Sequence, residues 1–257
     1  MVLALLSLPL ALCLALPFAA LVAYNSPQDW VRGLTSVAAL QALGLTLRTT
    51  FAAVFLCVVF GLPVAVLLAR FNFRAKAALD ILVDLPIMIP PVVVGVALLL
   101  AFGRYGIAGR YLTMAGIELP FSTAAVVMAQ FVMAVPFFVR AARAGFETVD
   151  SKLEDSARVL GATRWEVFRT ISLPLAMPSL AAGTVLAWAR ALSEFGATMM
   201  FAGSFPGRTQ TLALAVMSGM ESDLKTAVSI AGLSLFIGLT ALTATRAMIG
   251  RWNIPSG

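Results

Sequence analysis

The amino-acid sequence predicts an all-α, polytopic membrane protein with six transmembrane helices. Of its 257 residues 61% are hydrophobic and only 12% are charged, whereas soluble globular proteins carry about 25% charged residues and are about half apolar. The hydrophobic residues gather in runs long enough to cross the hydrocarbon core of a bilayer, which takes about 20 residues of α-helix. Backbone groups find no water in that core, so each run is expected to form a helix that satisfies its own hydrogen bonds.

Six such runs follow one another along the chain, at residues 3–24, 42–69, 81–102, 121–139, 175–202 and 227–249. The first run has no basic segment before it and is longer than the apolar part of a cleaved signal, so we interpret it as a retained helix. The prolines between Pro86 and Pro91 predict an irregular third span, because proline lacks the N–H that a helix needs. No linker, repeat or low-complexity segment divides the sequence, which predicts a single transmembrane domain over residues 1–257.

Basic residues indicate the orientation of these spans. Eleven of the 18 Lys and Arg residues fall in one set of loops and five in the opposite set. Short cytoplasmic loops retain Lys and Arg, so both termini are predicted to be cytoplasmic. This bias and attraction to anionic membrane lipid also account for the net charge of +6, which therefore does not indicate nucleic-acid binding.

The longest predicted cytoplasmic loop, residues 150–174 between the fourth and fifth spans, is unusually polar for this chain. Ser151 and Glu154 have the spacing of a capping box, and Gly161 suits the left-handed residue that ends a helix. A second box, from Thr163 to Glu166, predicts another helix, which presents Trp165, Phe168 and Ile171 before the fifth span. The loop is therefore predicted to be a helical hairpin.

The first helix of this hairpin carries a short apolar stripe. Leu153, Ala157 and Leu160 recur at helical spacing, while the charged residues point elsewhere. An amphipathic hairpin can rest on lipid headgroups. This stripe is small and the helix is capped at both ends, which favours docking in a groove of a partner protein over binding to lipid headgroups.

The spacing within this loop is specific enough to compare with a known family. Asp155-Ser156-Ala157, then Gly161, Ile171 and Leu173-Pro174, resembles the EAA-x3-G-x9-I-x-LP loop of importer permeases in the ATP-binding-cassette superfamily, with Asp for Glu and Ser for Ala at the first two positions. The resemblance implies a coupling helix that docks on a cytoplasmic ATPase. The implied docking residues are Leu153, Glu154, Asp155, Ser156, Ala157, Leu160 and Gly161.

No G-x-x-x-x-G-K-[ST] phosphate loop occurs in the sequence. No cofactor is therefore predicted for this chain, and ATP and Mg would be used by the separate ATPase. The chain itself is predicted not to be an enzyme.

A second resemblance concerns the substrate. The elements EFGA (residues 194–197) and FAG (201–203), the run Gly207–Leu212 and the segment 85–106 are similar to permeases for oxyanions, most of all those for molybdate. Ala213 stands where the molybdate type has proline, so sulfate and tungstate stay open as alternatives. The resemblance also implies a homodimer, a pair of ATPase subunits, an extracytoplasmic oxyanion-binding protein and the plasma (inner) membrane of a prokaryote.

Ionisable and hydroxyl side chains inside the spans are candidates for the translocation pathway, since a charge at bilayer depth is costly. Arg190 and Glu194 are four residues apart, so we expect their side chains to neutralise each other. We favour this interpretation over direct contact of these residues with the substrate. Arg48 either faces the pathway or extends toward the outer surface. Ser193 and Thr198 could contact a passing anion, although such hydroxyls often bond their own backbone.

Other classes of protein fit less well. The chain has no histidine, which excludes a Ser-His nucleophile, and Cys13 and Cys57 lie in separate spans without metal-ligand spacing. An ion-coupled secondary transporter remains the alternative of a different class. Transport driven by an ion gradient without ATP would distinguish it.

Overall fold

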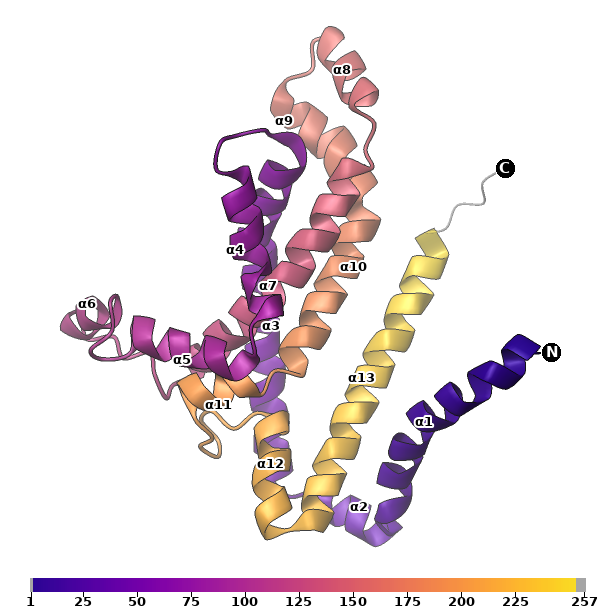
Figure 1. The fold of residues 1–257 in the computed structure, drawn as a ribbon, viewed down its shortest axis with the longest axis vertical. Helices are drawn as coiled ribbons and strands as arrows, with labels where there is room; N and C mark the ends of the chain where they lie inside the picture. Colours follow the sequence, from indigo (N-terminus) through magenta and orange to yellow (C-terminus); the bar gives the residue numbers. More distant parts are fainter. Residues whose placement is uncertain (1, 253–257) are drawn as a thin grey trace. The chain divides into compact units, whose positions relative to one another are not determined.

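The computed structural model describes the backbone of residues 2–252 and the side chains of residues 8–243. Residues 2–252 contain helices and loops but no strand, which confirms the all-α class (Figure 1). The helices are α1 (Val2–Tyr24), α2 (Pro27–Leu34), α3 (Val37–Arg70), α4 (Lys76–Met88), α5 (Pro91–Phe102), α6 (Gly109–Met114), α7 (Thr123–Glu147), α8 (Ser151–Val159), α9 (Arg164–Val167), the π-helix η1 (Phe168–Ser172), α10 (Leu173–Leu192), α11 (Gly196–Ala202), α12 (Leu212–Ser222) and α13 (Leu224–Trp252).

Four of the described helical segments are long and apolar enough to cross a membrane: Val37–Arg70, Thr123–Glu147, Arg164–Leu192 and Leu224–Thr243. Two bent pairs also reach the required length and hydropathy, α1 with α2 at 87° and α4 with α5 at 118°. The chain therefore has four candidate spans, or up to six if each bent pair counts as one.

The third predicted run, 81–102, is not one straight helix. α4 ends at Met88, Ile89 is extended with ψ 138°, and α5 begins at Pro91. A residue before proline is pushed out of the helical region, and Pro90 has no N–H to continue the helix. The chain turns by 118° at this point, whereas Pro86 lies inside α4 without ending it.

The fifth predicted run, 175–202, has different limits in the structure. Helix begins at Arg164, passes through α9 and η1, and ends at Leu192. A break at residues 193–195 then separates α10 from the short helix α11. Hydrophobicity alone predicted neither the start of the helix nor the break, because the first turns of the helix are polar and the residues after the break are again apolar.

The contacts between residues divide the chain into two compact units. The first contains the chain up to Thr46 together with Ser204–Leu239, and Ala39, Leu212 and Ile230 are among the buried residues of its core. In this unit Asn25 donates to the carbonyl of Lys225 at 2.8 Å and to the hydroxyl of Ser229 at 2.9 Å. The single domain expected over residues 1–257 stays a prediction.

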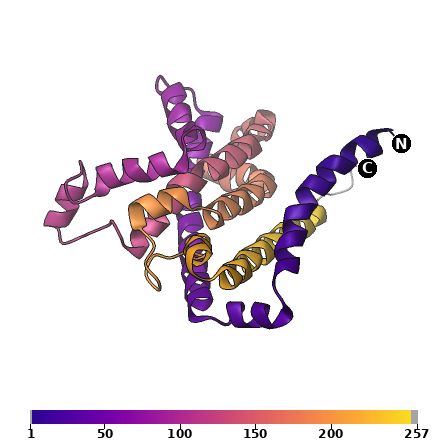
Figure 2. The same cartoon turned by 60° about the horizontal axis from the view of Figure 1, so that its bottom comes forward.

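The second unit contains Leu47–Gly203 and the chain from Thr240 onward. Within it α7 packs along α10, and α8 and α9 follow at one end of this pair (Figure 1). α11 packs against α5 and α7, while the chain after α5 continues to α6, away from α10 (Figure 2). A Cβ at Gly95 would lie 2.7 Å from the carbonyl oxygen of Ala197, so the close approach of α5 to α11 requires glycine there.

Candidate functional site

The hairpin formed by α8, α9 and η1 is the first candidate site. Its first helix is capped by Asp150, whose carboxylate accepts a hydrogen bond from the backbone N–H of Lys152 at 2.9 Å. The predicted capping box between Ser151 and Glu154 is therefore wrong. Asp150 supplies an acceptor one residue earlier, so Ser151 is already helical, and Glu154 is used elsewhere.

Glu154 is buried and joins three elements. Its Oε1 accepts a hydrogen bond from Nη2 of Arg70, at the end of α3, and another from Oγ of Ser172, in η1, each at 2.7 Å. The side chains of Arg70 and Glu154 are 21% and 11% exposed, so solvent screens this ion pair only partly. The base of the hairpin is thus fixed to α3 and to the start of α10.

The turn after α8 has the hydrogen bonds of a Schellman motif. Gly161 has φ +94°, its N–H donates to the carbonyl of Arg158, and the N–H of Ala162 donates to the carbonyl of Ala157, both at 3.0 Å. No atom outside the turn lies within 4 Å of a Cβ built on Gly161. Backbone conformation, and not crowding, is therefore what favours glycine at this position.

The second capping box is confirmed. The backbone N–H of Glu166 donates to Oγ1 of Thr163 at 3.3 Å, and Oε2 of Glu166 accepts from the N–H of Thr163 at 2.7 Å. The ring of Phe168 lies between those of Trp165 and Phe146, with centroids 5.6 and 6.1 Å away. These stacked rings hold the second arm of the hairpin against α7.

Apolar side chains project from the hairpin where no described residue covers them. Leu153 is 50% exposed, Leu160 88%, and Trp165 67%. Val159, which is not part of the predicted apolar stripe, is 87% exposed, whereas Ala157 is partly buried. We call Leu153, Val159, Leu160 and Trp165 the exposed hairpin surface.

The two remaining polar residues predicted on α8 are exposed. Asp155 lies 3.3 Å from the guanidinium of Arg158, and Ser156 donates to the carbonyl of Lys152 at 2.8 Å. Both interactions are local to the helix. They leave the exposed hairpin surface accessible.

The break between α10 and α11 is the second candidate site. Glu194 is 1% exposed, its Oε2 lies 2.8 Å from Nη2 of Arg190, and its Oε1 accepts from the backbone N–H of Ala197 at 2.7 Å. The ion pair predicted from the four-residue spacing is therefore present. Glu194 also satisfies one of the backbone donors that the start of α11 leaves free.

The other predicted pathway residues do not join this ion pair. Ser193 is exposed and donates to the carbonyl of Arg190 at 3.2 Å, as hydroxyls in membrane helices often do. Thr198 is fully buried, and its hydroxyl has no partner among the described residues. Arg48 is exposed on α3 and makes no ion pair with any described residue.

Three further polar residues are buried or partly buried but were not predicted from the sequence. Arg70 and Ser172 hold Glu154, but their distance from it along the chain gives no local signal. Gln130 is fully buried in α7, and neither atom of its amide has a partner among the described residues. An amide within an apolar run is the signal that could have identified Gln130.

Comparison with known proteins places this geometry in context. Residues 61–252 match the family described as "Binding-protein-dependent transport system inner membrane component". The molybdenum transport system permease protein ModB of Mycobacterium bovis is 42% identical over 220 residues, which cover 84% of this chain and 83% of that protein. ModB of Escherichia coli K12 is 46% identical over 183 residues, which cover 71% and 80%.

Among solved structures, the crystal structure of a bacterial ABC transporter involved in import of the acidic polysaccharide alginate contains a similar chain. The two chains superpose with a TM-score of 0.80 and 17% identity, over 98% of this chain and 96% of the other. At this identity the similarity concerns the fold alone.

Proposed function

Because the chain belongs to the family of inner membrane components of binding-protein-dependent transport systems, we propose that it is the permease subunit of an ATP-driven importer of molybdate. The observation that carries the proposal is the identity of 42% to 46% with proteins named molybdenum transport permeases, over most of the chain. Sulfate and tungstate, which the sequence motifs leave open, are the alternative substrates.

In this proposal the chain crosses the plasma (inner) membrane of a prokaryote six times, with both termini in the cytoplasm. The four long helices and the two bent pairs support that number of spans. The excess of basic residues in one set of loops supports the orientation. The hairpin between α7 and α10 then faces the cytoplasm.

The hairpin suits the role of a coupling helix on a separate ATPase. The exposed hairpin surface offers an apolar patch of the kind that inserts into a groove of a partner protein. Glu154 fixes the other side of α8 to α3 and η1, so a force applied at the patch would reach two spans. ATP and Mg would be bound by that ATPase and not by this chain.

Two further partners complete the proposed transporter. A second copy of the chain would supply the other half of a pathway along a two-fold axis. An extracytoplasmic binding protein would deliver and select the oxyanion. Within the pathway, Arg48, Arg190, Ser193, Glu194 and Thr198 are the proposed polar residues.

The test is uptake of radiolabelled molybdate by proteoliposomes containing the permease, the ATPase and the binding protein. We expect uptake that requires internal ATP and that excess unlabelled molybdate suppresses at lower concentration than sulfate or tungstate. Stronger suppression by sulfate or tungstate would reassign the substrate. Uptake driven by an ion gradient without ATP would identify a secondary transporter instead.

Replacement of Gly161 by valine should reduce ATP-driven uptake at least tenfold. A residue with a Cβ in the left-handed conformation costs about 1–2 kcal/mol, which the turn avoids by changing the direction of α8. Membrane insertion should be unaffected, whereas copurification of the ATPase or the coupling of its hydrolysis to uptake should be lost.

Gly116→Val is the matched control for this variant. Gly116 also has a positive φ, +78°, with no atom outside its turn within 4 Å of a Cβ, but it lies in the loop after α6. Equal strain at that position should leave uptake within about twofold of the parent, since the hairpin is unchanged. Equal losses in the two variants would show that general strain, and not the position of α8, limits transport.

A further inference from the structure

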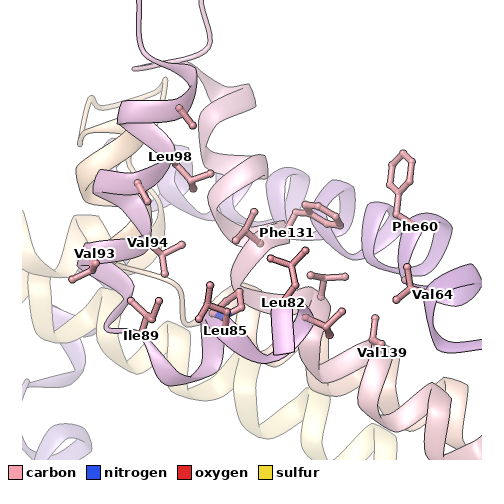
Figure 3. A pocket seen from close by; sticks show the side chains of 17 residues that line it. Phe60, Val64, Leu82, Leu85, Ile89, Val93, Val94, Leu98, Phe131 and Val139 are labelled. Atoms are coloured by element: carbon pink, nitrogen blue, oxygen red, sulfur yellow. The ribbon is translucent and has the colours of Figure 1, made fainter. Parts of the chain in front are cut away.

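An apolar slot of ≈ 620 Å³ lies between α3, α4, α5 and α7, and all the residues that line it belong to the second unit. In Figure 3 the lining side chains follow an elongated path, with Leu98 toward one end and Val64 and Val139 toward the other. Every lining residue is aliphatic, aromatic, glycine or proline. Such a lining offers no hydrogen-bond donor side chain to an oxyanion, so the slot is not a site for the transported substrate.

The slot has a buried floor and an exposed rim. Val94 and Val139 on the floor are 8% and 2% exposed, whereas Phe60, Leu82 and Val93 on the rim are 59%, 63% and 51% exposed. The slot therefore opens on an apolar outer surface. In a chain with at least four candidate membrane spans, hydrocarbon is the medium that such a surface meets.

One end of the slot adjoins charged residues. Val83 and Val139 line the slot, and the next residues along α4 and α7, Asp84 and Arg140, form an ion pair. Nε of Arg140 donates to Oδ1 of Asp84 at 2.6 Å, and its Nη2 donates to Oδ2. An ion pair of this kind is favoured where the hydrocarbon of a membrane gives way to polar headgroups.

Arg140 retains the capacity to bind a further anion. Its side chain is 58% exposed, and the bonds to Asp84 use Nε and Nη2, so Nη1 is left for another acceptor. Arg143, one turn further along α7, is less available because its side chain is only 28% exposed and it already bonds two carboxylates, those of Glu147 and Asp80. A phosphate oxygen is an acceptor well suited to a guanidinium.

We propose that the slot binds one acyl chain of a phospholipid, with the phosphate of that lipid at Arg140. A phospholipid has a charged end followed by a long apolar chain, and the site has the same order: an exposed guanidinium, then an elongated apolar path. The volume lies in the range of about 300–1,000 Å³ that is usual for small-molecule sites. A second copy of the chain is the competing occupant, and the test distinguishes the two.

The test is native mass spectrometry of the full chain, purified in detergent and exposed to dioleoyl phosphatidylglycerol. We expect one lipid to be retained per chain. Ala97→Trp, which fills the slot from α5, should lower the retained fraction at least tenfold, and Val135→Phe from α7 should act in the same direction. Ala124→Trp is the matched control, because Ala124 is exposed on α7 outside the slot and its replacement should leave retention unchanged.

The headgroup is tested with dioleoylglycerol, which has the same chains and no phosphate. The double variant Arg140→Gln and Asp84→Asn, which leaves no unpaired charge, should lower retention of phosphatidylglycerol several-fold and leave retention of dioleoylglycerol unchanged. Undiminished retention in both Ala97→Trp and Val135→Phe would overturn the site. Dissociation of a dimer by these variants, with the number of bound lipids unchanged, would also overturn it and would assign the slot to a subunit contact.

Discussion

Replacement of Glu154 by alanine should reduce ATP-driven molybdate uptake at least tenfold while the assembled complex still hydrolyses ATP. The substitution removes the acceptor of Arg70 and Ser172 together, so α8 loses its attachment to α3 and η1. Breaking a buried ion pair lowers the free energy of unfolding by about 3–5 kcal/mol. Because Arg70 is partly exposed, we expect a smaller loss of about 2–3 kcal/mol for Glu154→Ala. The ATPase would then move a hairpin that no longer moves the spans.

The measurement compares uptake and ATP hydrolysis in the same proteoliposomes, at equal permease content. Glu147→Ala is the matched control. Glu147 is also a carboxylate, lies at the end of α7 next to the hairpin and forms a 2.7 Å ion pair with Arg143, but its side chain is 47% exposed. Exposed pairs contribute about 0–1 kcal/mol, so this variant should retain uptake within about twofold. Equal uptake and equal ATP hydrolysis in the two variants would show that Glu154 does not couple the ATPase to the spans.

A double substitution separates positioning from general destabilisation. Glu154→Leu combined with Arg70→Met replaces both charges with apolar groups, which often restores stability to a site that formerly held a buried ion pair. We expect the thermal stability of the double variant to recover while uptake stays low, since no bond joins α8 to α3. Recovery of uptake along with stability would show that Glu154 acts only through folding.

Sequence reasoning succeeded here where the determining interactions are local. The features predicted correctly all join residues within a few positions of each other: the left-handed turn at Gly161 after α8, the capping box from Thr163 to Glu166 and the Arg190–Glu194 pair. Such patterns depend on backbone geometry that the residue types themselves favour. The chain therefore predicts these features without knowledge of the rest of the fold.

The failures involve interactions between distant segments or competition between neighbours. Glu154 was assigned to a cap because Ser151 has the right spacing, but Arg70, 84 positions away, attracts its carboxylate and Asp150 caps the helix instead. Hydropathy also identified the apolar runs, but it did not predict where the helices begin and end. It could not show that the chain turns by 118° after Met88, because the prolines predict a break and not its angle.

Replacement of Glu194 should have the second large effect, this time on assembly. Glu194→Ala leaves Arg190 without its partner at the end of a candidate span and removes an acceptor from the start of α11. An unpaired charge at the bilayer centre destabilises a protein by about 2.5–3.5 kcal/mol. Because Arg190 lies near the end of its span, we expect a destabilisation of about 2 kcal/mol. The lost cap adds about 1 kcal/mol. We expect a lower melting temperature in detergent and less assembled complex in the membrane.

A series of variants at this ion pair distinguishes a structural role from a role in the pathway. Glu194→Gln keeps an acceptor for Ala197 and removes the charge, and combining it with Arg190→Met removes the unpaired cation as well. If the pair is structural, the double variant should assemble and import molybdate with the KM of the parent. A restored melting temperature with KM raised at least fivefold would instead place the pair in contact with the anion. Thr184→Ala, on the same helix α10, is the control. It removes a hydroxyl that donates to the carbonyl of Leu180 at 2.8 Å, and it should leave both quantities unchanged because it affects neither the ion pair nor the start of α11.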